Sequence, residues 1–367
     1  MGNQSVTIKD VAKAAGVSIT TVSRYINKRY ESMSVETRER IEKVIEELNY
    51  QPNKMAQGLK GQTRTIAVVV VNLGYPFAVS VIRSISSVLS EMGYALLVGE
   101  SADDTEQEAQ LLQSLISQGV DGIIIQTSGQ NNELLERIAA EKPVVLIDRQ
   151  FDVPGAANVI TNNQEASREL TERLFQQGYQ HVVFVSEEPS NLSTRVERLD
   201  GYLAACRAAS IPSDVRWVLR EDPVSIAALA KDLQSQPPKK PFAVYTANGL
   251  VMLELYPKLT HLRYSIPNEM GIATFDEPDW VHVTRPRLTC VRQPTDEMGI
   301  TAAQTVLRRL TDRPAQVAKP GQVGLVRATN PDSDTKAHPK NRFGERTENQ
   351  TTVIPSEVIW GDSSSLR

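Results

Sequence analysis

The chain has 367 residues, 40% of them hydrophobic and 23% charged, with a net charge of −4, which together indicate a globular protein with more than one folded unit. The longest apolar runs, such as residues 66–71, are far shorter than the roughly 20 residues that a membrane helix needs, and the first residues lack the apolar segment of a secretory signal. Two cysteines, Cys206 and Cys290, are too few for a disulfide scaffold or a metal site, so we expect a cytoplasmic protein without a metal or other cofactor.

The N-terminal part differs in charge from the rest of the chain. Residues 1–63 contain 10 Lys and Arg against 7 Asp and Glu, whereas the remainder is acidic. The apolar spacing over residues 7–50 predicts three short helices. Thr7 and Ser18 stand at the expected N-caps of the first two, and Gly16 ends the first.

Short strands and helices alternate from Thr65 onward. The expected strands are residues 66–71, 95–98, 122–126 and 144–147, then 181–185, 215–219, 242–246 and 271–275. The expected helices are residues 78–92, 104–118 and 131–140, then 164–177, 194–208, 223–234 and 248–256. This order predicts two successive α/β units, each a doubly wound parallel sheet covered by helices, with a cleft between them.

The C-terminal part interrupts this alternation. Residues 311–350 are rich in Pro, Asn, Asp, Thr and Lys and contain few apolar residues, so we expect a mobile insertion. Residues 353–360 then predict a final strand.

The second short helix lies within VSITTVSRYIN, residues 17–27, and carries hydroxyl groups where an ordinary surface helix has long charged side chains. Two short helices joined by a glycine-containing turn form a helix-turn-helix unit, whose second helix enters the major groove of DNA. Compact Ser and Thr side chains allow close approach to the bases, and Arg24 suits a bidentate contact to guanine. Val17 and Val22 would face a small core. The alternative is a plain helical hairpin with a solvated, hydroxyl-rich face.

The stretches TIKDVAKAAGVSITTVSRYIN and ETRERIEKVIEELNYQPNKMAQGLKG closely resemble the headpiece of the lactose/galactose repressor (LacI/GalR) family. The resemblance is almost continuous over residues 6–61, and the two α/β units resemble the family's regulatory core, which is itself similar to periplasmic sugar-binding proteins. It implies a transcriptional regulator, foremost a repressor of carbohydrate catabolic genes, that binds a pseudo-palindromic double-stranded DNA operator as a homodimer.

The resemblance also implies a division into domains. The expected parts are a helix-turn-helix headpiece at 1–51, a hinge helix at 52–63 and a two-lobed core at 64–367, with a first lobe at about 64–162 and 292–310 and a second lobe at about 163–291 and 352–362.

The headpiece positions that match the family's DNA contacts include residues of the second helix and of the hinge. They are Thr7, Ser18, Ile19, Thr20, Thr21, Ser23, Arg24, Asn27, Asn53, Lys54, Ala56 and Leu59. The hinge is expected to become helical only on DNA, where Leu59 would wedge into a minor-groove step. The alternative for Leu59 is a buried linker leucine.

The resemblance places a small sugar-like effector between the lobes. The matching residues are Tyr75, Phe77, Asp148, Arg149, Arg195, Arg198, Asn248 and Asp276. Carboxylates and an amide suit sugar hydroxyls, aromatic rings suit a sugar face, and arginines suit a carboxylate or phosphate. Each also has a structural alternative: the aspartates could cap turns, the rings could belong to a lobe core, and Arg149 and Arg195 could be solvated.

Departures from the family pattern argue against a neutral hexose. Gly249 follows Asn248 where members often have Asp, and residues 220–225 contain no aromatic residue. Arg149 and Arg195 favour a sugar acid, and the headpiece resembles those of regulators of ketodeoxygluconate and hexuronate use.

Other functions are less consistent with the sequence. A solute-binding receptor for sugar transport would share the lobes, but it needs a secretory signal and no DNA-binding headpiece. An enzyme is disfavoured because the histidines show no metal spacing and the chain has no Gly-x-Ser-x-Gly elbow or phosphate-binding loop. The sequence does not identify the effector, the operator, the target genes or any oligomer beyond the dimer. It also leaves open whether the effector releases or promotes DNA binding.

Overall fold

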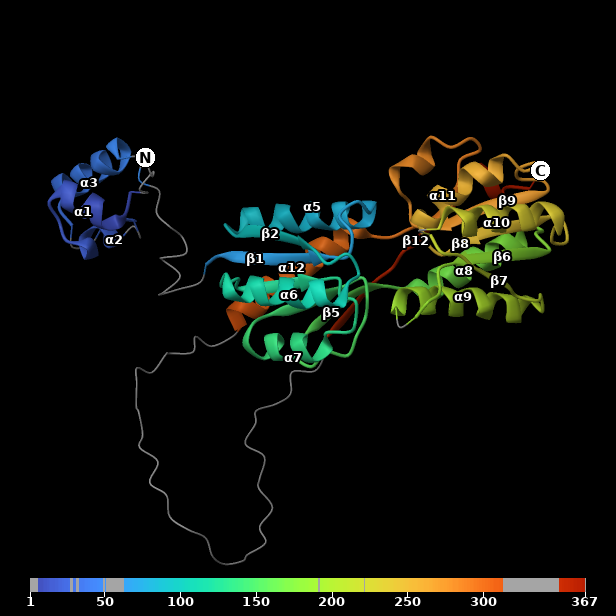
Figure 1. Ribbon diagram of the computed structural model, residues 1–367, viewed down its shortest axis with the longest axis horizontal. Coiled ribbons are helices and arrows are strands. Elements are labelled where there is room, and N and C mark those ends of the chain that lie inside the picture. The colour runs from blue at the N-terminus through green and yellow to red at the C-terminus, as the bar shows by residue number, and fades with distance from the viewer. Residues whose placement is uncertain are drawn as a thin grey trace, which may run out of the picture. The chain divides into compact units, whose positions relative to one another are not determined.

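A computed structural model describes residues 6–26, 29–30, 33–48, 50, 63–190, 192–220, 222–312 and 350–366 (Figure 1). The chain divides into two compact units, Met1–Thr63 and Arg64–Arg367. Nearly all of the predicted hinge at 52–63 and of the predicted insertion at 311–350 lies outside the described residues.

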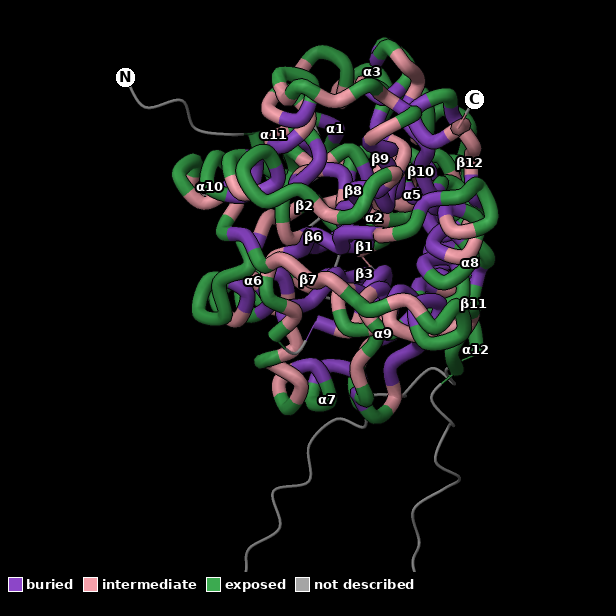
Figure 2. Tube along the Cα trace, turned by 90° about the vertical axis from the view of Figure 1, so that its right-hand side faces the viewer, coloured by how far each residue is buried: buried purple, intermediate pink, exposed green. Residues whose placement is uncertain are grey.

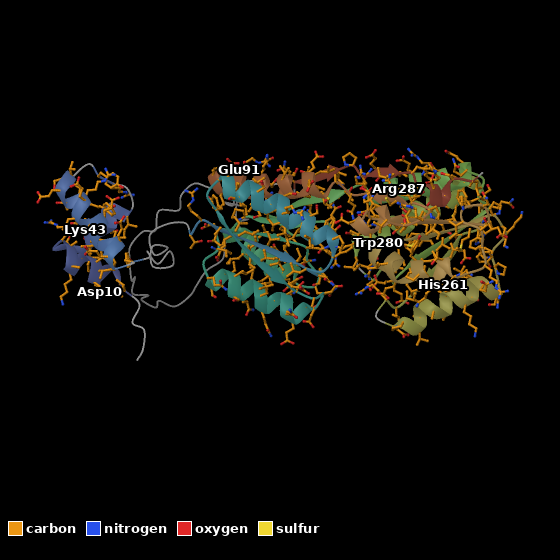
Figure 3. The ribbon with its side chains drawn as sticks, turned by 90° about the horizontal axis from the view of Figure 1, so that it is seen from above. Asp10, Lys43, Glu91, His261, Trp280 and Arg287 are labelled. Atoms are coloured by element: carbon orange, nitrogen blue, oxygen red, sulfur yellow. The ribbon has the colours of Figure 1, made fainter. Side chains whose placement is uncertain are left out.

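The N-terminal unit is helical, as its apolar spacing predicts. Its helices are α1 (Ile8–Ala15), α2 (Ile19–Ile26) and α3 (Val35–Glu47), and Figure 3 labels Asp10 and Lys43 on this unit. The Asp10 carboxylate accepts hydrogen bonds from the backbone N–H and the hydroxyl of Thr7, at 2.8 and 2.7 Å. Gly16 ends α1 with a positive φ of 63°, which glycine adopts without steric cost. Ser18 Oγ accepts from the backbone N–H of Thr21 at 3.1 Å, as an N-cap does.

The core of this unit is small and confirms the predicted inward faces. Val11, Val22 and Ile41 are fully buried, one from each helix. Val17 is partly buried against the same cluster. Because so few side chains form the core, the orientation of α2 depends directly on Val22.

The first lobe of the second unit is built on a parallel sheet with the strand order β11-β5-β4-β3-β1-β2. The strands are β1 (Thr65–Val70), β2 (Ala95–Glu100), β3 (Gly122–Ile125), β4 (Val144–Ile147), β5 (Ala157–Thr161) and β11 (Thr351–Ile354). Helices α5 (Pro76–Glu91) and α12 (Thr295–Asp312) cover one face, and α6 (Thr105–Ser117) and α7 (Asn132–Glu141) cover the other.

The second lobe repeats this plan with the strand order β12-β10-β9-β8-β6-β7. The strands are β6 (His181–Ser186), β7 (Asp214–Trp217), β8 (Phe242–Thr246), β9 (Met270–Phe275), β10 (Thr289–Arg292) and β12 (Glu357–Ile359). Helices α8 (Asn163–Gln176) and α9 (Ser193–Ala209) cover one face, α10 (Pro223–Ser235) and α11 (Gly249–Thr260) cover the other, and the short helices η2 (Asp279–His282) and η3 (Asp362–Ser364) complete the lobe. Only β12 is antiparallel to its neighbour among the described strands.

The predicted fold class, a helical headpiece followed along the chain by two doubly wound α/β lobes, is confirmed. Figure 2 shows buried strands at the centre of the lobes and exposed outer faces on the helices around them. Within the described residues, no helix is long and apolar enough to cross a membrane.

Several elements differ from the sequence prediction. The strands β5 and β10 and the helix α12 were not predicted, and the expected single strand at 353–360 is wrong. That segment forms β11, which pairs with β5 in the first lobe, and β12, which pairs with β10 in the second. The assignment of residues 352–354 to the second lobe is therefore also wrong. The chain crosses between the lobes at Pro355 and Ser356, which separate the two short strands.

Candidate functional site

Helix α2 presents a polar face that the small core leaves uncovered. Ile19 is 45% exposed, and Ser18, Thr20 and Arg24 are also exposed, whereas Val22 of the same helix is fully buried. An exposed isoleucine between hydroxyl groups and an arginine is suited to contact base edges and thymine methyl groups in a major groove. This surface is the candidate DNA-contact face.

The remaining predicted DNA contacts fall into two sets. Thr7 is exposed at the start of α1, while Thr21 and Ser23 are half-buried, with the Thr21 and Ser18 hydroxyls 2.8 Å apart. The others lie outside the described residues, and their predicted roles stay predictions: Asn27, Asn53, Lys54, Ala56 and Leu59.

A cavity of about 330 Å³ lies between the two lobes of the second unit. Predicted effector residues from both lobes line it, namely Tyr75, Asp148, Arg149, Arg195, Arg198 and Asn248. The strands of each lobe end at this cavity, which explains why residues far apart in sequence meet there. The predicted Phe77 and Asp276 are not among its lining residues.

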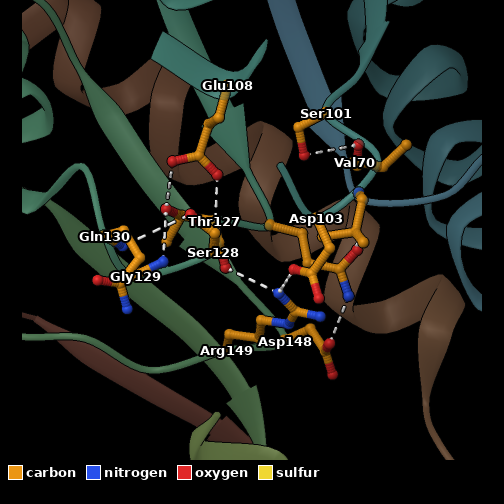
Figure 4. Close-up of polar contacts among 12 residues, drawn as sticks. Val70, Ser101, Asp103, Glu108, Thr127, Ser128, Gly129, Gln130, Asp148 and Arg149 are labelled. Atoms are coloured by element: carbon orange, nitrogen blue, oxygen red, sulfur yellow. Dashed lines mark hydrogen bonds and ion pairs between the residues drawn. The ribbon is translucent and has the colours of Figure 1, made fainter. Parts of the chain in front are cut away.

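The wall formed by the first lobe is held by Asp148 and Arg149, which directly follow β4 (Figure 4). Asp148 has a positive φ of 69°, and its carboxylate accepts a hydrogen bond from Gln126 Nε2 at 2.6 Å. Arg149 Nη1 donates to Asp103 Oδ1 at 2.8 Å and to the carbonyl of Thr127 at 3.2 Å. The Arg149 side chain is only 9% exposed, so the alternative of a solvated arginine is wrong.

A buried carboxylate supports this wall from behind. Glu108 on α6 accepts hydrogen bonds from the Thr127 hydroxyl at 2.9 Å and the Ser128 backbone N–H at 2.7 Å (Figure 4). It also accepts one from Asn131 Nδ2 at 3.0 Å. The loop after β3 is thereby fixed, and with it the Thr127 carbonyl that receives Arg149.

The wall formed by the second lobe contains Arg198, which projects from α9 and is 5% exposed. Its Nε donates to Asn163 Oδ1 and its Nη1 to the carbonyl of Ala247, both at 2.9 Å. The guanidinium carbon lies 3.7 Å from the ring centre of Phe275, a cation–π distance. Burial lowers the pKa of Arg198 from its usual value, and the nearby Asp148 carboxylate acts in the opposite direction.

Arg195 and Asn248 share a partner on the same wall. Arg195 Nη2 donates to Glu187 Oε2 at 2.8 Å, and Asn248 Nδ2 donates to the same oxygen at 3.4 Å. Asn248 is also the N-cap of α11, because its Oδ1 accepts from the backbone N–H of Val251 at 2.9 Å.

Asp276 lies behind the cavity rather than on it. It follows β9 with a positive φ of 76° and accepts hydrogen bonds from the Gly249 backbone N–H at 3.0 Å and from Gln293 Nε2 at 2.5 Å. Tyr75 Oη, from the first lobe, donates to the same carboxylate and so joins the lobes. Burial raises the pKa of Asp276 to about 6, although these Gly249 and Gln293 hydrogen bonds lower it in part. Asp276 thus matches the turn-capping alternative as well as a position next to the effector.

A second hollow shares Tyr75 with this cavity and has Phe77 and Asp276 among its lining residues. Phe77 is 6% exposed and packs in the core beneath α5, so the core alternative describes this ring. Gln293 lines both hollows, and its buried Oε1 has no hydrogen-bond partner within the described part of the chain. A ligand hydroxyl could supply the missing donor.

Sequence reasoning missed several residues of the cavity wall. They are Asn72, Glu100, Asp103, Gln126, Glu187, Thr194, Arg220 and Gln293. Gln126, Glu187 and Gln293 are polar residues that directly follow strands in the structure, as Asp148 does. The sequence did not single them out because the predicted strands at 122–126 and 181–185 end at other residues, and β10, which precedes Gln293, was not predicted.

The chemistry of the cavity is that of polar recognition. Its lining combines carboxylates, amides and the guanidinium groups of Arg149, Arg195, Arg198 and Arg220. Across the described ranges, no group of three or more His, Cys, Asp or Glu could hold a metal ion.

Comparison with known proteins agrees with this architecture. Residues 7–53 match the model of bacterial regulatory proteins of the lacI family, and residues 63–323 match that of periplasmic binding proteins and the sugar-binding domain of the LacI family. The chain belongs to the LacI family. This member is therefore a helix-turn-helix transcriptional regulator that binds DNA, and the family assignment made from the headpiece motifs is confirmed.

Curated relatives in the LacI family are regulators of similar length. The chain is 34% identical to the HTH-type transcriptional regulator KdgR of Bacillus subtilis over 83% of this chain and 91% of that protein. It is 35% identical to the HTH-type transcriptional regulator PtxS of Pseudomonas aeruginosa over 89% of this chain and 96% of that one.

Solved structures show the same fold. The structure of the lac repressor dimer bound to operator and the anti-inducer ONPF superposes with a TM-score of 0.76 and 20% identity, covering 99% of this chain and 100% of that one. That of the transcriptional regulator CelR in complex with cellobiose has a TM-score of 0.63 and 25% identity, covering 98% of this chain and 99% of that one.

Proposed function

We propose that this LacI-family regulator is a repressor of carbohydrate catabolic genes whose affinity for its operator is controlled by a sugar acid bound between the lobes. It would act in the cytoplasm as a homodimer on a pseudo-palindromic operator, without catalytic activity. One α2 helix reaches only one half-site, so two headpieces are needed to read a palindrome. The lac repressor, whose fold this chain shares, is a dimer in its operator-bound structure, which supports this assembly.

The effector class is supported by arginines on both walls of one cavity. Arg149 belongs to the first lobe, whereas Arg195 and Arg198 belong to the second, and all of them line the same space. Guanidinium groups bind carboxylates in a fixed, bidentate geometry. Asp148 and Asn248 on the same walls suit the hydroxyl groups of a sugar, and CelR, a neighbour in fold, binds cellobiose.

Control of DNA binding would follow from contacts to both lobes. A ligand that touches Arg149 and Arg198 at the same time prefers one relative position of the lobes, and it shifts the population toward that position by its difference in affinity. The interlobe hydrogen bond from Tyr75 to Asp276 would form or break with the same change in the relative position of the lobes. A solute-binding receptor would share this cavity, but the DNA-contact face of α2 has no use in such a protein.

A thermal-shift screen of the full chain tests the effector class. The panel contains D-glucuronate, D-galacturonate, D-gluconate and ketodeoxygluconate, each beside D-glucose or D-galactose at equal concentration and ionic strength. We expect at least one acid to raise the thermal midpoint, since a ligand that binds only the folded state stabilises it. Stabilisation by the neutral sugars alone would refute the sugar-acid proposal.

A further inference from the structure

Glu187 lies among side chains of the second lobe that donate hydrogen bonds or carry positive charge at the cavity wall. It directly follows β6 and lines the cavity with Arg195, Arg220 and Asn248. Its Oε2 accepts hydrogen bonds from Arg195 Nη2 at 2.8 Å and Asn248 Nδ2 at 3.4 Å, and its Oε1 is 3.9 Å from Arg220 Nε. A single protein carboxylate thus occupies the point at which these groups converge.

Both arginines have further partners that would hold them near this point without Glu187. Arg195 Nη1 donates to the backbone carbonyl of Glu188 at 3.1 Å. Arg220 Nη1 is 3.7 Å from Glu254 Oε1. If the Glu187 carboxylate turned away, the arginines would still be directed toward the cavity.

The Arg195–Glu187 ion pair is also accessible enough to solvent for another anion to replace the Glu187 carboxylate. The side chains of Arg195 and Glu187 are each 22% exposed, in contrast to the nearly buried Arg149 and Arg198. A half-buried ion pair is worth little net free energy, because solvent screens it and both side chains lose rotamer freedom. Another carboxylate that enters the cavity can therefore compete with Glu187.

We propose that Glu187 is an internal stand-in for the acidic group of the effector, and that the effector's carboxylate replaces it on Arg195, Arg220 and Asn248. This inference rests on the proposed sugar-acid effector. The exchange of one carboxylate for another keeps a negative charge beside the arginines. A neutral sugar has no anion to exchange and leaves the Glu187–Arg195 pair in place, so only an acid has to compete with Glu187.

Removal of the internal competitor distinguishes this role from the obvious alternative. If Glu187 instead accepted hydrogen bonds from sugar hydroxyls, its loss would weaken binding of acids and neutral sugars alike. If it replaced the effector's anion, Glu187→Gln would strengthen binding of acids specifically, because Gln has the same shape without the charge.

The test is isothermal titration calorimetry of the full chain with the acid that stabilises the wild type most and with D-glucose. We expect E187Q to bind the acid about fivefold more tightly, which corresponds to ~1 kcal/mol, the upper end of the range measured for surface ion pairs, because this pair is only partly exposed. E165Q is the matched control, since Glu165 is an exposed residue of the same lobe and the change removes the same charge. We expect it to bind like the wild type.

A double-mutant cycle locates the effect. The gain caused by E187Q should vanish when Arg195 is already replaced by Gln, because the competing pair is then absent. Glu187→Ala provides a second variant if the Gln amide itself binds Arg195.

The outcomes separate the two proposals. If the wild type binds an acid and neither E187Q nor E187A binds it more tightly, the stand-in role is refuted while the sugar-acid effector stands. Equal gains for the acid and for D-glucose would also refute it. If no form of the protein binds any acid of the panel, the proposed function fails and this inference fails with it.

Discussion

Replacement of Arg198 by Ala should abolish the response to effector while leaving DNA binding intact. The guanidinium lies on the cavity, where it is available to an anionic ligand, and it is fixed by Asn163, the Ala247 carbonyl and the ring of Phe275. The headpiece belongs to a separate compact unit with its own core, so the substitution does not touch the DNA-contact face.

The magnitude follows from what Arg198→Ala leaves behind. Asn163 Oδ1 and the Ala247 carbonyl each lose a donor, at a cost of ~1–3 kcal/mol for a buried polar group. Removal of a buried charge offsets part of this cost, since burial already disfavours the charged form of Arg198. We expect a net loss of ~2–4 kcal/mol and a thermal midpoint about 3–6 °C lower for a unit of this size. Loss of a charge-assisted contact to the ligand should weaken acid binding at least about 30-fold.

The assay compares operator binding with and without the acid for the wild type, R198A, R198K and R207A. R198K keeps the charge but not the planar fork, so it should respond weakly and should remain folded if R198A does not. Arg207 is exposed on the same helix α9, and R207A should respond normally. A normal effector response in R198A would show that the cavity assignment is wrong.

Three further substitutions test other parts of the molecule. Arg24→Ala should weaken operator binding by ~1–3 kcal/mol and relax one base position; unchanged preference across operator variants in gel shifts would contradict this. Burial raises the pKa of Asp276 from its usual 3.8 to about 6, so between these pH values folding is coupled to uptake of a proton. The stability conferred by this group therefore falls as the pH rises from about 4 to about 6, by on the order of 3 kcal/mol. Asp276→Asn should flatten that part of the pH profile of the thermal midpoint, and an identical slope would argue against a raised pKa. At Gly201, an added Cβ would lie 2.2 Å from the backbone oxygen of Gln164, so Gly201→Ala should push α9 from α8 and cost ~2–3 kcal/mol, which an unchanged midpoint would disprove.

Long, periodic segments were predictable from the sequence because they carry their own signals. The strand β4 is an uninterrupted apolar run, and Ser18, predicted as the N-cap of the second helix, caps α2 in the structure. The missed strand β5 has the sequence ANVIT, in which Asn158 interrupts the apolar residues. It is a strand because β4 and β11 flank it, and a single-sequence pattern does not contain that information.

The passage of the chain from the first lobe to the second near the C-terminus could not be predicted either, because it also depends on strand partners distant in sequence. Strands β11 and β12 are separated by Pro355 and Ser356, and together they read as one strand. Which sheet each one joins depends on partners nearly two hundred residues away for β11 and about seventy away for β12.

The lining of the cavity was predicted in part, and there is a physical reason why some residues were placed correctly and others were not. Asp148 and Arg149 follow β4, Arg195 and Arg198 lie in the first two turns of α9, and Asn248 is the N-cap of α11. The structure places all of them on one cavity. For the aromatic residues of α5, the sequence does not determine the rotation of the helix. Tyr75 at its N-cap reaches the cavity, whereas Phe77 two residues later turns into the core.

The central claim is that a small acid bound between the lobes changes the affinity of the headpiece for DNA. The most direct measurement is binding of the full chain to palindromic genomic fragments at several salt concentrations, with and without the acid that stabilises the protein most. We predict salt-dependent, sequence-specific binding whose affinity the acid changes in the wild type and not in R198A. A protein that preferred no fragment, or that bound one with the same affinity with and without every acid of the panel, would contradict the account.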